Sequence, residues 1–330
     1  MLSTYLTRDW GLKVPIIGAP MTPMSGGSLA AALSNCGALG MLGVSSTQPV
    51  EQLERDVDDY RRLAGAHPFG IGLMVWALDA RPELLDAAIR AKPFVIAMSF
   101  GDPAKYMPRM RDAGIRVASQ VQDRQSARAA EAAGVDLIVA QGTEAGGHTG
   151  GVGTLPLLQI VLETVRLPVV AAGGIASGRG LAAVLAAGAA GAWIGTPLLV
   201  AEEARNSPVA RRKVIEALET DTVHTRVFDV VQRIPWSPRF PGRALVNAFT
   251  QRWAGHEDEL ARDDEARRVF QHAKQAEDYS NALIYAGQSV GLIHRIEPAA
   301  SIVDRIAADA ESALRAATAV VPLAPSGPLS

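Results

Sequence analysis

Eight short apolar segments, each followed by a stretch of helical periodicity, constrain the fold of this 330-residue chain more than any other feature. The segments are rich in Val and Ile and have the length of buried strands. Strands that alternate with amphipathic helices predict βαβ units around a parallel sheet. The predicted strands are residues 14–18, 38–42, 70–75, 94–98, 115–119, 137–140, 169–172 and 192–194.

The spacing of these strands favours a closed barrel. Successive strands begin roughly 20 to 30 residues apart, which is about one βαβ repeat. Three of the intervening stretches, 48–63, 82–91 and 123–133, have an amphipathic helical pattern. Eight such units predict an α/β fold, a (β/α)8 TIM barrel with its site at the carboxyl ends of the strands. An open, doubly wound sheet is the alternative.

The pattern changes after the eighth strand. Residues from about 202 to 279 are rich in charge and mostly helical in pattern, with an interruption at the Pro-containing segment 234–242. We expect a helix over 298–317 and a frayed tail after it. The predicted parts are a barrel over 1–203, a helical subdomain over 204–280, and a C-terminal segment over 281–330 that returns to the barrel.

Composition restricts the partners. The chain is 48% hydrophobic and 20% charged, which suits a large buried core, and its net charge of -2 gives no reason to expect nucleic acid or an anionic membrane as partner. Cys36 is the single cysteine, so an internal disulfide and a multi-cysteine metal site are excluded. The N-terminus lacks the pattern of a signal peptide. We therefore expect a cytoplasmic protein that binds no metal.

Two glycine-rich strand ends predict a phosphate site. Gly173 and Gly174 follow the seventh strand and precede a helix, and Gly195 and Thr196 follow the eighth strand. Backbone N–H groups at this position of a barrel are suited to bind a phosphate. The alternative is that these glycines only make tight turns. A dinucleotide-binding motif is disfavoured, because Pro156 stands where its third glycine would be.

His148 is the candidate catalytic residue. It ends the glycine-rich loop 141–148 after the sixth strand, so the imidazole is expected at the mouth of the barrel, where it can exchange a proton near neutral pH. Glu144 either holds this loop or is a solvated acid. The remaining histidines are interpreted as structural or solvated: His67, His224, His256, His272 and His294.

Two other strand ends offer contacts for a flat ring. Ala19, Pro20 and Met21 follow the first strand and combine a rigid turn with a thioether side chain. Gln120, after the fifth strand, has an amide that both donates and accepts hydrogen bonds. The alternatives are core packing for Met21 and a surface position for Gln120.

The loop Ala140-Gln-Gly-Thr-Glu-Ala-Gly-Gly-His-Thr-Gly150 resembles the signature of nitronate monooxygenases, formerly called 2-nitropropane dioxygenases. Segments 16–21, 170–175 and 193–196 are similar to other motifs of that family, and 285–288 extends the similarity. The resemblance implies a TIM barrel that binds FMN, with His148 as the catalytic residue. The implied cofactor-binding residues are Ala19, Pro20, Met21, Gln120, Gly146, Gly147, Gly173, Gly174, Gly195, Thr196 and Gln288.

The same resemblance implies the reaction and its rivals. A nitronate monooxygenase oxidises alkyl nitronates, and in some cases nitroalkanes, with O2 to carbonyl compounds and nitrite. FabK-type enoyl-acyl-carrier-protein reductases and NADH:quinone reductases have a similar histidine loop, so an NAD(P)H-dependent FMN reductase of quinones or enoyl thioesters is the alternative. A barrel that binds flavin or phosphate without catalysing a reaction is a third interpretation. A homodimer is one alternative for the oligomeric state.

One departure from the family concerns the third strand. Relatives commonly have Asn where this chain has Gly72, which removes a side-chain contact to flavin or substrate. Met74 and Trp76 follow nearby and are expected to make the pocket apolar.

Overall fold

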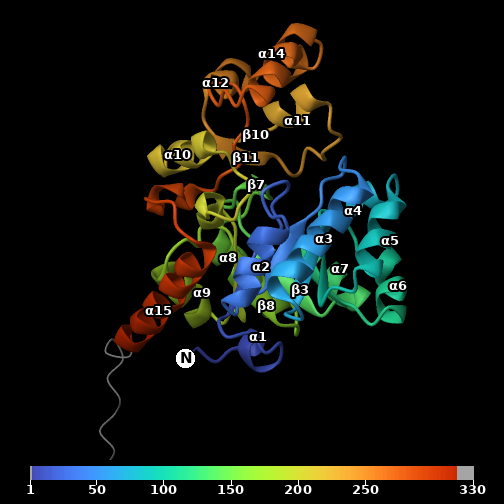
Figure 1. Ribbon diagram of the computed structural model, residues 1–330, viewed down its shortest axis with the longest axis vertical. Helices are drawn as coiled ribbons and strands as arrows, with labels where there is room; N and C mark the ends of the chain where they lie inside the picture. Colours follow the sequence, from blue (N-terminus) through green and yellow to red (C-terminus); the bar gives the residue numbers. More distant parts are fainter. Residues whose placement is uncertain (1, 318–330) are drawn as a thin grey trace, which may run out of the picture.

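The chain folds as the predicted (β/α)8 barrel, with additional helices after the eighth barrel strand (Figure 1). The computed structural model describes residues 2–317, so the predicted tail lies outside the described residues. All eight predicted strands are confirmed. They are β1 Ile16–Gly18, β2 Gly40–Gly43, β3 Phe69–Met74, β4 Val95–Ser99, β5 Arg116–Val121, β6 Leu137–Gln141, β8 Val169–Ala172 and β9 Gly191–Ile194.

These strands pair in parallel around a closed ring. Their order is β1-β9-β8-β6-β5-β4-β3-β2. Neighbouring strands of the ring are therefore consecutive in the chain, apart from β7, which belongs to another sheet. Leu39, just before β2, closes the barrel: its N–H donates to Ile16 O at 3.0 Å, and its carbonyl accepts from Gly18 N–H at 2.9 Å. The open sheet is thereby excluded.

Helices cover the outside of this ring. The amphipathic stretches predicted at 48–63, 82–91 and 123–133 are confirmed as α3, α5 and α7, and Gly134 ends α7 in the left-handed conformation with φ 84°. The helices of the barrel part are α1 Tyr5–Arg8, α2 Gly27–Asn35, α3 Val50–Ala64, α4 Val75–Leu78, α5 Pro82–Arg90, η1 Ala104–Tyr106, α6 Met107–Asp112, α7 Arg124–Ala133, α8 Thr154–Thr164, α9 Gly178–Ala186 and η2 Thr196–Val200.

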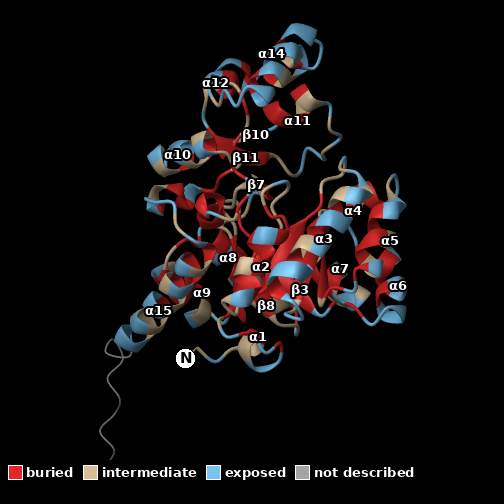
Figure 2. Ribbon diagram, viewed as in Figure 1, coloured by how far each residue is buried: buried red, intermediate tan, exposed pale blue. Residues whose placement is uncertain are grey.

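The core has two layers, because alternate strand residues face the barrel interior and the helices. On β3, Ile71 and Leu73 belong to the layer under the helices, whereas a Cβ on Gly70 would meet Met41 inside the barrel. Figure 2 shows the buried residues concentrated in the strands and on the helix faces that cover them. Side chains of the N-terminal segment, Leu6, Trp10 and Leu12, pack with the interior layer and close the end of the barrel at which α1 lies.

The chain between η2 and the C-terminal helix forms the additional part at the opposite end (Figure 1). It is mostly helical as expected, but it also contributes two strands that the sequence did not predict. Its elements are α10 Pro208–Glu216, β10 Thr222–Thr225, α11 Val227–Gln232, β11 Gly242–Leu245, α12 Ala248–Trp253, α13 Glu257–Leu260 and α14 Asp264–Gln275. We propose the division predicted above, with 204–280 as the subdomain.

A small antiparallel sheet joins the subdomain to the barrel. Its strand order is β10-β11-β7, and β7, Gly147–His148, belongs to the loop after β6. His148 pairs with Gly242 of β11, and Gly147 pairs with Arg243. The loop that carries the histidine is therefore also the edge strand of the subdomain's sheet.

The C-terminal helix packs on the barrel helices. After η3 Gln288–Leu292, the helix α15 Ala299–Ala317 packs on α9 and α2. Gly178 at the start of α9 allows this contact, because a Cβ there would lie 2.5 Å from Ala310 N. No helix within residues 2–317 is long and apolar enough to cross a membrane.

Candidate active site

The predicted catalytic histidine lies where the barrel meets the subdomain. The side chain of His148 is only 7% exposed, and its Nε2 lies 2.8 Å from Oδ1 of Asp229, whose side chain is 6% exposed. Trp236 stacks on the imidazole with ring centroids 3.5 Å apart and an interplanar angle of 12°. Both partners come from the subdomain, so barrel and subdomain build this site together.

Two buried glutamines fix the backbone of the histidine. Nε2 of Gln141 donates to His148 O at 3.0 Å, and Nε2 of Gln122 donates to Oε1 of Gln141 at 3.0 Å. Buried amides of this kind are seldom left without partners, because an unpaired polar group in the core costs about 1 to 3 kcal/mol. The chain of amides therefore ties β7 to the ends of β5 and β6.

Glu144 holds the same loop, which confirms one of its two interpretations. Its carboxylate accepts hydrogen bonds from Thr154 N–H at 2.8 Å and from Thr154 Oγ1 at 2.8 Å, at the N-terminus of α8. On the other side, Arg243 Nε donates to Thr143 O at 2.7 Å. Burial lowers the pKa of Arg243 from its usual value, and the nearby Glu144 carboxylate opposes this shift.

His224 keeps a structural role beside the site. Its Nε2 lies 2.8 Å from Pro241 O and 2.9 Å from Thr149 Oγ1. Burial, followed by the positive charge of Arg243, lowers the pKa of His224. The side chain is therefore neutral near pH 7 and adds no positive charge next to His148.

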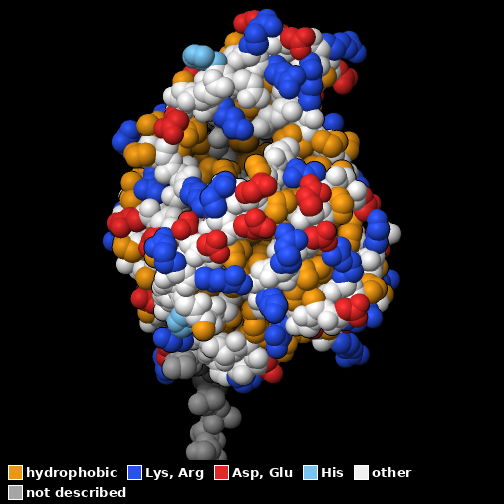
Figure 3. All heavy atoms as spheres, turned by 45° about the vertical axis from the view of Figure 1, so that its right-hand side comes forward, with side chains coloured by type: hydrophobic (Ala, Val, Ile, Leu, Met, Phe, Trp, Pro, Cys, Tyr) orange, Lys and Arg blue, Asp and Glu red, His pale blue; other side chains and the backbone are white. Residues whose placement is uncertain are grey.

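Aromatic side chains surround the histidine. Trp236 also contacts Trp76 and Phe100 edge to face, with ring centroids 5.1 Å and 4.9 Å away, and Phe240 lies 5.4 Å from Phe100. Figure 3 shows hydrophobic side chains gathered at the level where the subdomain meets the barrel, whereas charges of both signs are mixed over the rest of that face. The apolar surroundings expected from Trp76 are thus confirmed.

The two predicted phosphate-binding ends have backbone donors available. Gly173 and Gly174 adopt positive φ values of 100° and 71°. Within the described residues, the N–H groups of Gly174, Ile175 and Gly195 donate to no backbone or side-chain acceptor. Thr196 is buried, and its Oγ1 accepts from Gly287 N–H at 3.0 Å. Free N–H groups with glycine geometry at these loops match the requirements of a phosphate.

The end of β1 lies next to these loops. Ala19 N–H donates to Ile194 O at 2.7 Å, and a Cβ on Gly195 would lie 3.3 Å from both Ala19 Cβ and Met21 Sδ. Met21 is partly buried and packs against two hydrophobic clusters, so it also serves the core. Ala19, Met21 and Gly195 therefore lie close together.

Gly72 has a steric explanation in this chain. A Cβ at that position would lie 2.5 Å from Pro20 Cβ, which leaves no room for a side chain. A side chain at this position, such as the asparagine expected from the family resemblance, and this placement of Pro20 exclude each other. Pro20 occupies the space that the missing side chain would otherwise reach.

The remaining predicted residues lie at the same end of the barrel. Gln120 is the penultimate residue of β5, in register with Ser99 and Val139. It is partly buried, and its amide has no hydrogen-bond partner among residues 2–317. Gly146 packs against Gly287, and Gln288 N–H donates to Glu144 O at 2.9 Å. Gln288 itself is exposed, so only its backbone joins the histidine loop, and a side-chain contact to cofactor stays a prediction.

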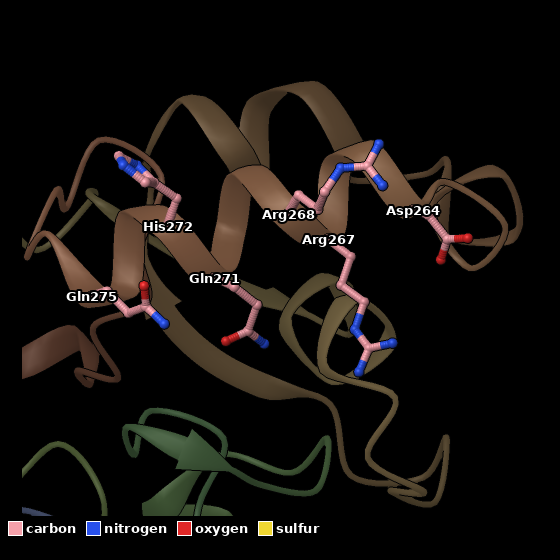
Figure 4. A pocket seen from close by; sticks show the side chains of 6 residues that line it. All are labelled: Asp264, Arg267, Arg268, Gln271, His272 and Gln275. Atoms are coloured by element: carbon pink, nitrogen blue, oxygen red, sulfur yellow. The ribbon is translucent and has the colours of Figure 1, made fainter.

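A depression on α14 is not part of this site. Figure 4 shows that its lining residues, among them Arg267, Arg268 and His272, come from one helix and extend in different directions. This helix lies at the far end of the subdomain (Figure 1). In the described part of the chain, no three potential ligands are grouped to hold a metal ion.

The parallel barrel, the glycine-rich strand ends and the buried histidine at its mouth define an enzyme of the (β/α)8 class. Residues 3–309 match the model of one such family, described as nitronate monooxygenase. The chain belongs to the nitronate monooxygenase family.

Two relatives illustrate the range of this similarity. A Probable nitronate monooxygenase of Staphylococcus aureus is 32% identical over 68% of this chain and 75% of its own length. A Rhodococcus jostii protein is 35% identical over 71% of this chain: (3aS,4S,5R,7aS)-5-hydroxy-7a-methyl-1-oxo-octahydro-1H-indene-4-carboxyl-CoA dehydrogenase. The match spans 65% of the R. jostii protein, slightly less than two thirds of its length.

Solved structures extend the likeness to more than nine tenths of the chain. FabK from Thermotoga maritima aligns with a TM-score of 0.85 and 28% identity, over 97% of this chain and all of that one. A nitroalkane oxidase from Streptomyces ansochromogenes aligns with a TM-score of 0.79 and 30% identity, over 92% of this chain and 98% of that one.

Proposed function

We propose that this chain is an FMN-dependent nitronate monooxygenase that oxidises alkyl nitronates, and also neutral nitroalkanes, with O2 to carbonyl compounds and nitrite. The observation that carries this proposal is the environment of His148. Its imidazole is buried among aromatic rings, has a carboxylate on Nε2, and has no hydrogen-bond partner for Nδ1 among residues 2–317. One nitrogen is therefore available to a reactant.

The residues at the mouth of the barrel suit FMN. The free N–H groups of Gly174, Ile175 and Gly195 would hold the phosphate, and Ala19, Pro20 and Met21 would line the ring, with Gln120 at its polar edge. When bound, FMN supplies the redox chemistry by accepting electrons from the nitronate. His148 would orient the nitro group of a nitronate, or remove the α-proton of a neutral nitroalkane.

We expect the purified protein to be yellow without added cofactor and to release FMN on denaturation. Two loops with free backbone donors converge where one phosphate fits, and nothing in the sequence corresponds to an adenine-binding half. Absorbance near the flavin bands and chromatography of the released cofactor check this. A colourless protein that binds no added FMN, or one that binds FAD equally well, would contradict the cofactor assignment.

Anaerobic mixing tests the reaction. The flavin of the purified protein should bleach with propyl nitronate and not with NADH, because the nitronate is the proposed electron donor. Readmission of O2 should then restore the flavin spectrum and yield nitrite. Bleaching by NADH alone would overturn the proposal in favour of a reductase.

The reductase is a second candidate that one observation favours. FabK aligns over 97% of this chain with a TM-score of 0.85, and the R. jostii relative is named as a carboxyl-CoA dehydrogenase. In that case NAD(P)H would reduce FMN, and His148 would donate a proton to an enoyl thioester or quinone. NADH consumption that depends on such an acceptor would support it.

We also propose a cytoplasmic location. A reducing compartment suits a chain whose single cysteine, Cys36, is a free thiol. Fractionation of cells that express the protein would test this.

A further inference from the structure

The two nitrogens of His148 have different surroundings. Nε2 lies 2.8 Å from Oδ1 of Asp229, whereas Nδ1 forms no hydrogen bond with any residue of the described chain. A carboxylate accepts hydrogen bonds and cannot donate one when ionised, so the nitrogen that faces it carries a proton. In neutral imidazole, a proton on Nε2 leaves the lone pair on Nδ1.

Asp229 is held firmly in this position. It belongs to α11, where the neighbouring Val227 and Phe228 are fully or almost fully buried in the subdomain core. Its own carbonyl accepts from Ile234 N–H at 3.0 Å, at the start of the segment that carries Trp236. A carboxylate on a packed helix keeps its geometry better than one on a free loop.

Aromatic contacts fix the orientation of the His148 ring, in addition to the contact of its Nε2 with Asp229. Trp236 lies flat on one face at 3.5 Å, and Tyr285 approaches edge-on with centroids 5.4 Å apart. The phenol of Tyr285 also lies near Asp229, and burial together with this carboxylate raises the pKa of Tyr285 well above its usual range. Tyr285 therefore stays protonated and adds no second negative charge.

We propose that Asp229 is the positioning residue of this site: it accepts the Nε2–H of His148 and thereby makes Nδ1 the atom that takes the α-proton of a neutral nitroalkane. In this step the C–H bond breaks, the Nδ1–H bond forms, and the electron pair from carbon moves into the nitro group. The product is a nitronate beside an imidazolium whose positive charge faces the Asp229 carboxylate. This step rests on the proposed function, whereas the Nε2–H assignment does not.

Three other titratable groups border this pair. His224 on β10 and Arg243 on β11 lie on the side of the small sheet, and Tyr285 lies next to Asp229. His224 is neutral near pH 7, Arg243 keeps its charge and Tyr285 keeps its proton. None of these three groups supplies negative charge to an imidazolium at His148, whereas the Asp229 carboxylate lies 2.8 Å from its Nε2.

Nitrogen NMR of histidine-labelled, flavin-loaded protein tests the tautomer directly. We expect the His148 signals of the wild type to report a proton on Nε2. In Asp229→Asn the amide can donate to Nε2 instead, so the opposite tautomer should gain population. Tyr285→Phe is the matched control, because it alters a neighbour of Asp229 without removing the acceptor, and it should leave the tautomer unchanged. A wild-type proton on Nδ1, or an unchanged tautomer in Asp229→Asn, would overturn the proposal.

Kinetics then connect the tautomer to the reaction. Positioned proton transfer contributes about 100- to 10,000-fold in total, so Asp229→Asn should lower kcat for a neutral nitroalkane by about 10- to 1,000-fold with little change in KM. Asp229→Glu should restore part of the rate.

Failure of the proposed function and failure of the positioning role of Asp229 give different results. If the wild type consumes neither nitroalkane nor nitronate, the proposed function fails, while the NMR result still decides the role of Asp229 toward His148. If the wild type is active but Asp229→Asn retains its rate, the proposed function stands and the positioning role is wrong.

Discussion

Replacement of His148 by Ala should abolish most turnover of a neutral nitroalkane while flavin remains bound. The imidazole is the group proposed to remove the α-proton, and positioned bases typically contribute about 100- to 10,000-fold. A preformed nitronate has already lost that proton, so its oxidation should decrease far less. Rates with the two substrates, measured side by side on wild type and variant, check this. If His148→Ala kept the rates of the wild type with both substrates, the histidine would be structural.

A second variant separates chemistry from folding. Removal of the imidazole leaves the buried Asp229 without its partner, and breaking one side of a buried pair can cost several kcal/mol of stability. His148→Gln keeps an N–H donor within reach of that carboxylate but provides no base of comparable strength. It should resemble His148→Ala in rate and the wild type in thermal stability.

Gly174→Asp should weaken FMN binding by about 100- to 1,000-fold. A carboxylate would stand beside the proposed phosphate, and two like charges about 4 Å apart near a protein surface repel by about 4 kcal/mol. The site has room for the side chain, because a Cβ on Gly174 would meet only Glu144 Cβ and Cγ, at 3.6 Å and 4.0 Å. Titration of apoprotein with FMN, followed by fluorescence quenching, measures the effect.

Two controls identify the cause of this loss. Gly174→Ala adds the strain of a side chain at φ 71° without a charge, so it should weaken binding much less than Gly174→Asp. Ser177→Ala removes the N-cap of α9, where Ser177 Oγ accepts from Gly180 N–H at 3.2 Å, and should cost stability of about 1 kcal/mol but little flavin affinity. Equal flavin affinity in Gly174→Asp and wild type would refute the phosphate assignment.

The barrel could be predicted because its strands are buried on both faces. Each strand then appears as a continuous apolar run, as residues 169–172 do, and such runs are visible without structural information. Strands β10 and β11 lack this signal. Residues 222–225 are mostly half-buried and mix Thr and His with a single Val, so nothing distinguished them from the surrounding helical, charge-rich sequence.

The candidate site was predictable only where the chain itself brings residues together. His148 and its glycines share one loop, and this loop resembles a family signature. Asp229 and Trp236 lie more than 80 residues away in sequence and meet the histidine only because β11 pairs with β7. Trp236, set among prolines in a charge-rich stretch, was one visible signal. Gln141, a polar residue that ends an apolar strand, was another sign of a buried contact.

The pairing of β7 with β11 also separates two tasks within one active site. The barrel alone contributes the strand ends proposed to hold the cofactor, whereas the subdomain contributes Asp229 and Trp236, which contact the reacting histidine. Sequence change in the subdomain can therefore alter which compounds are accepted without disturbing cofactor retention. A chimera that exchanges residues 204–280 between two family members should inherit its substrate preference from the donor of that segment and its flavin affinity from the donor of the barrel.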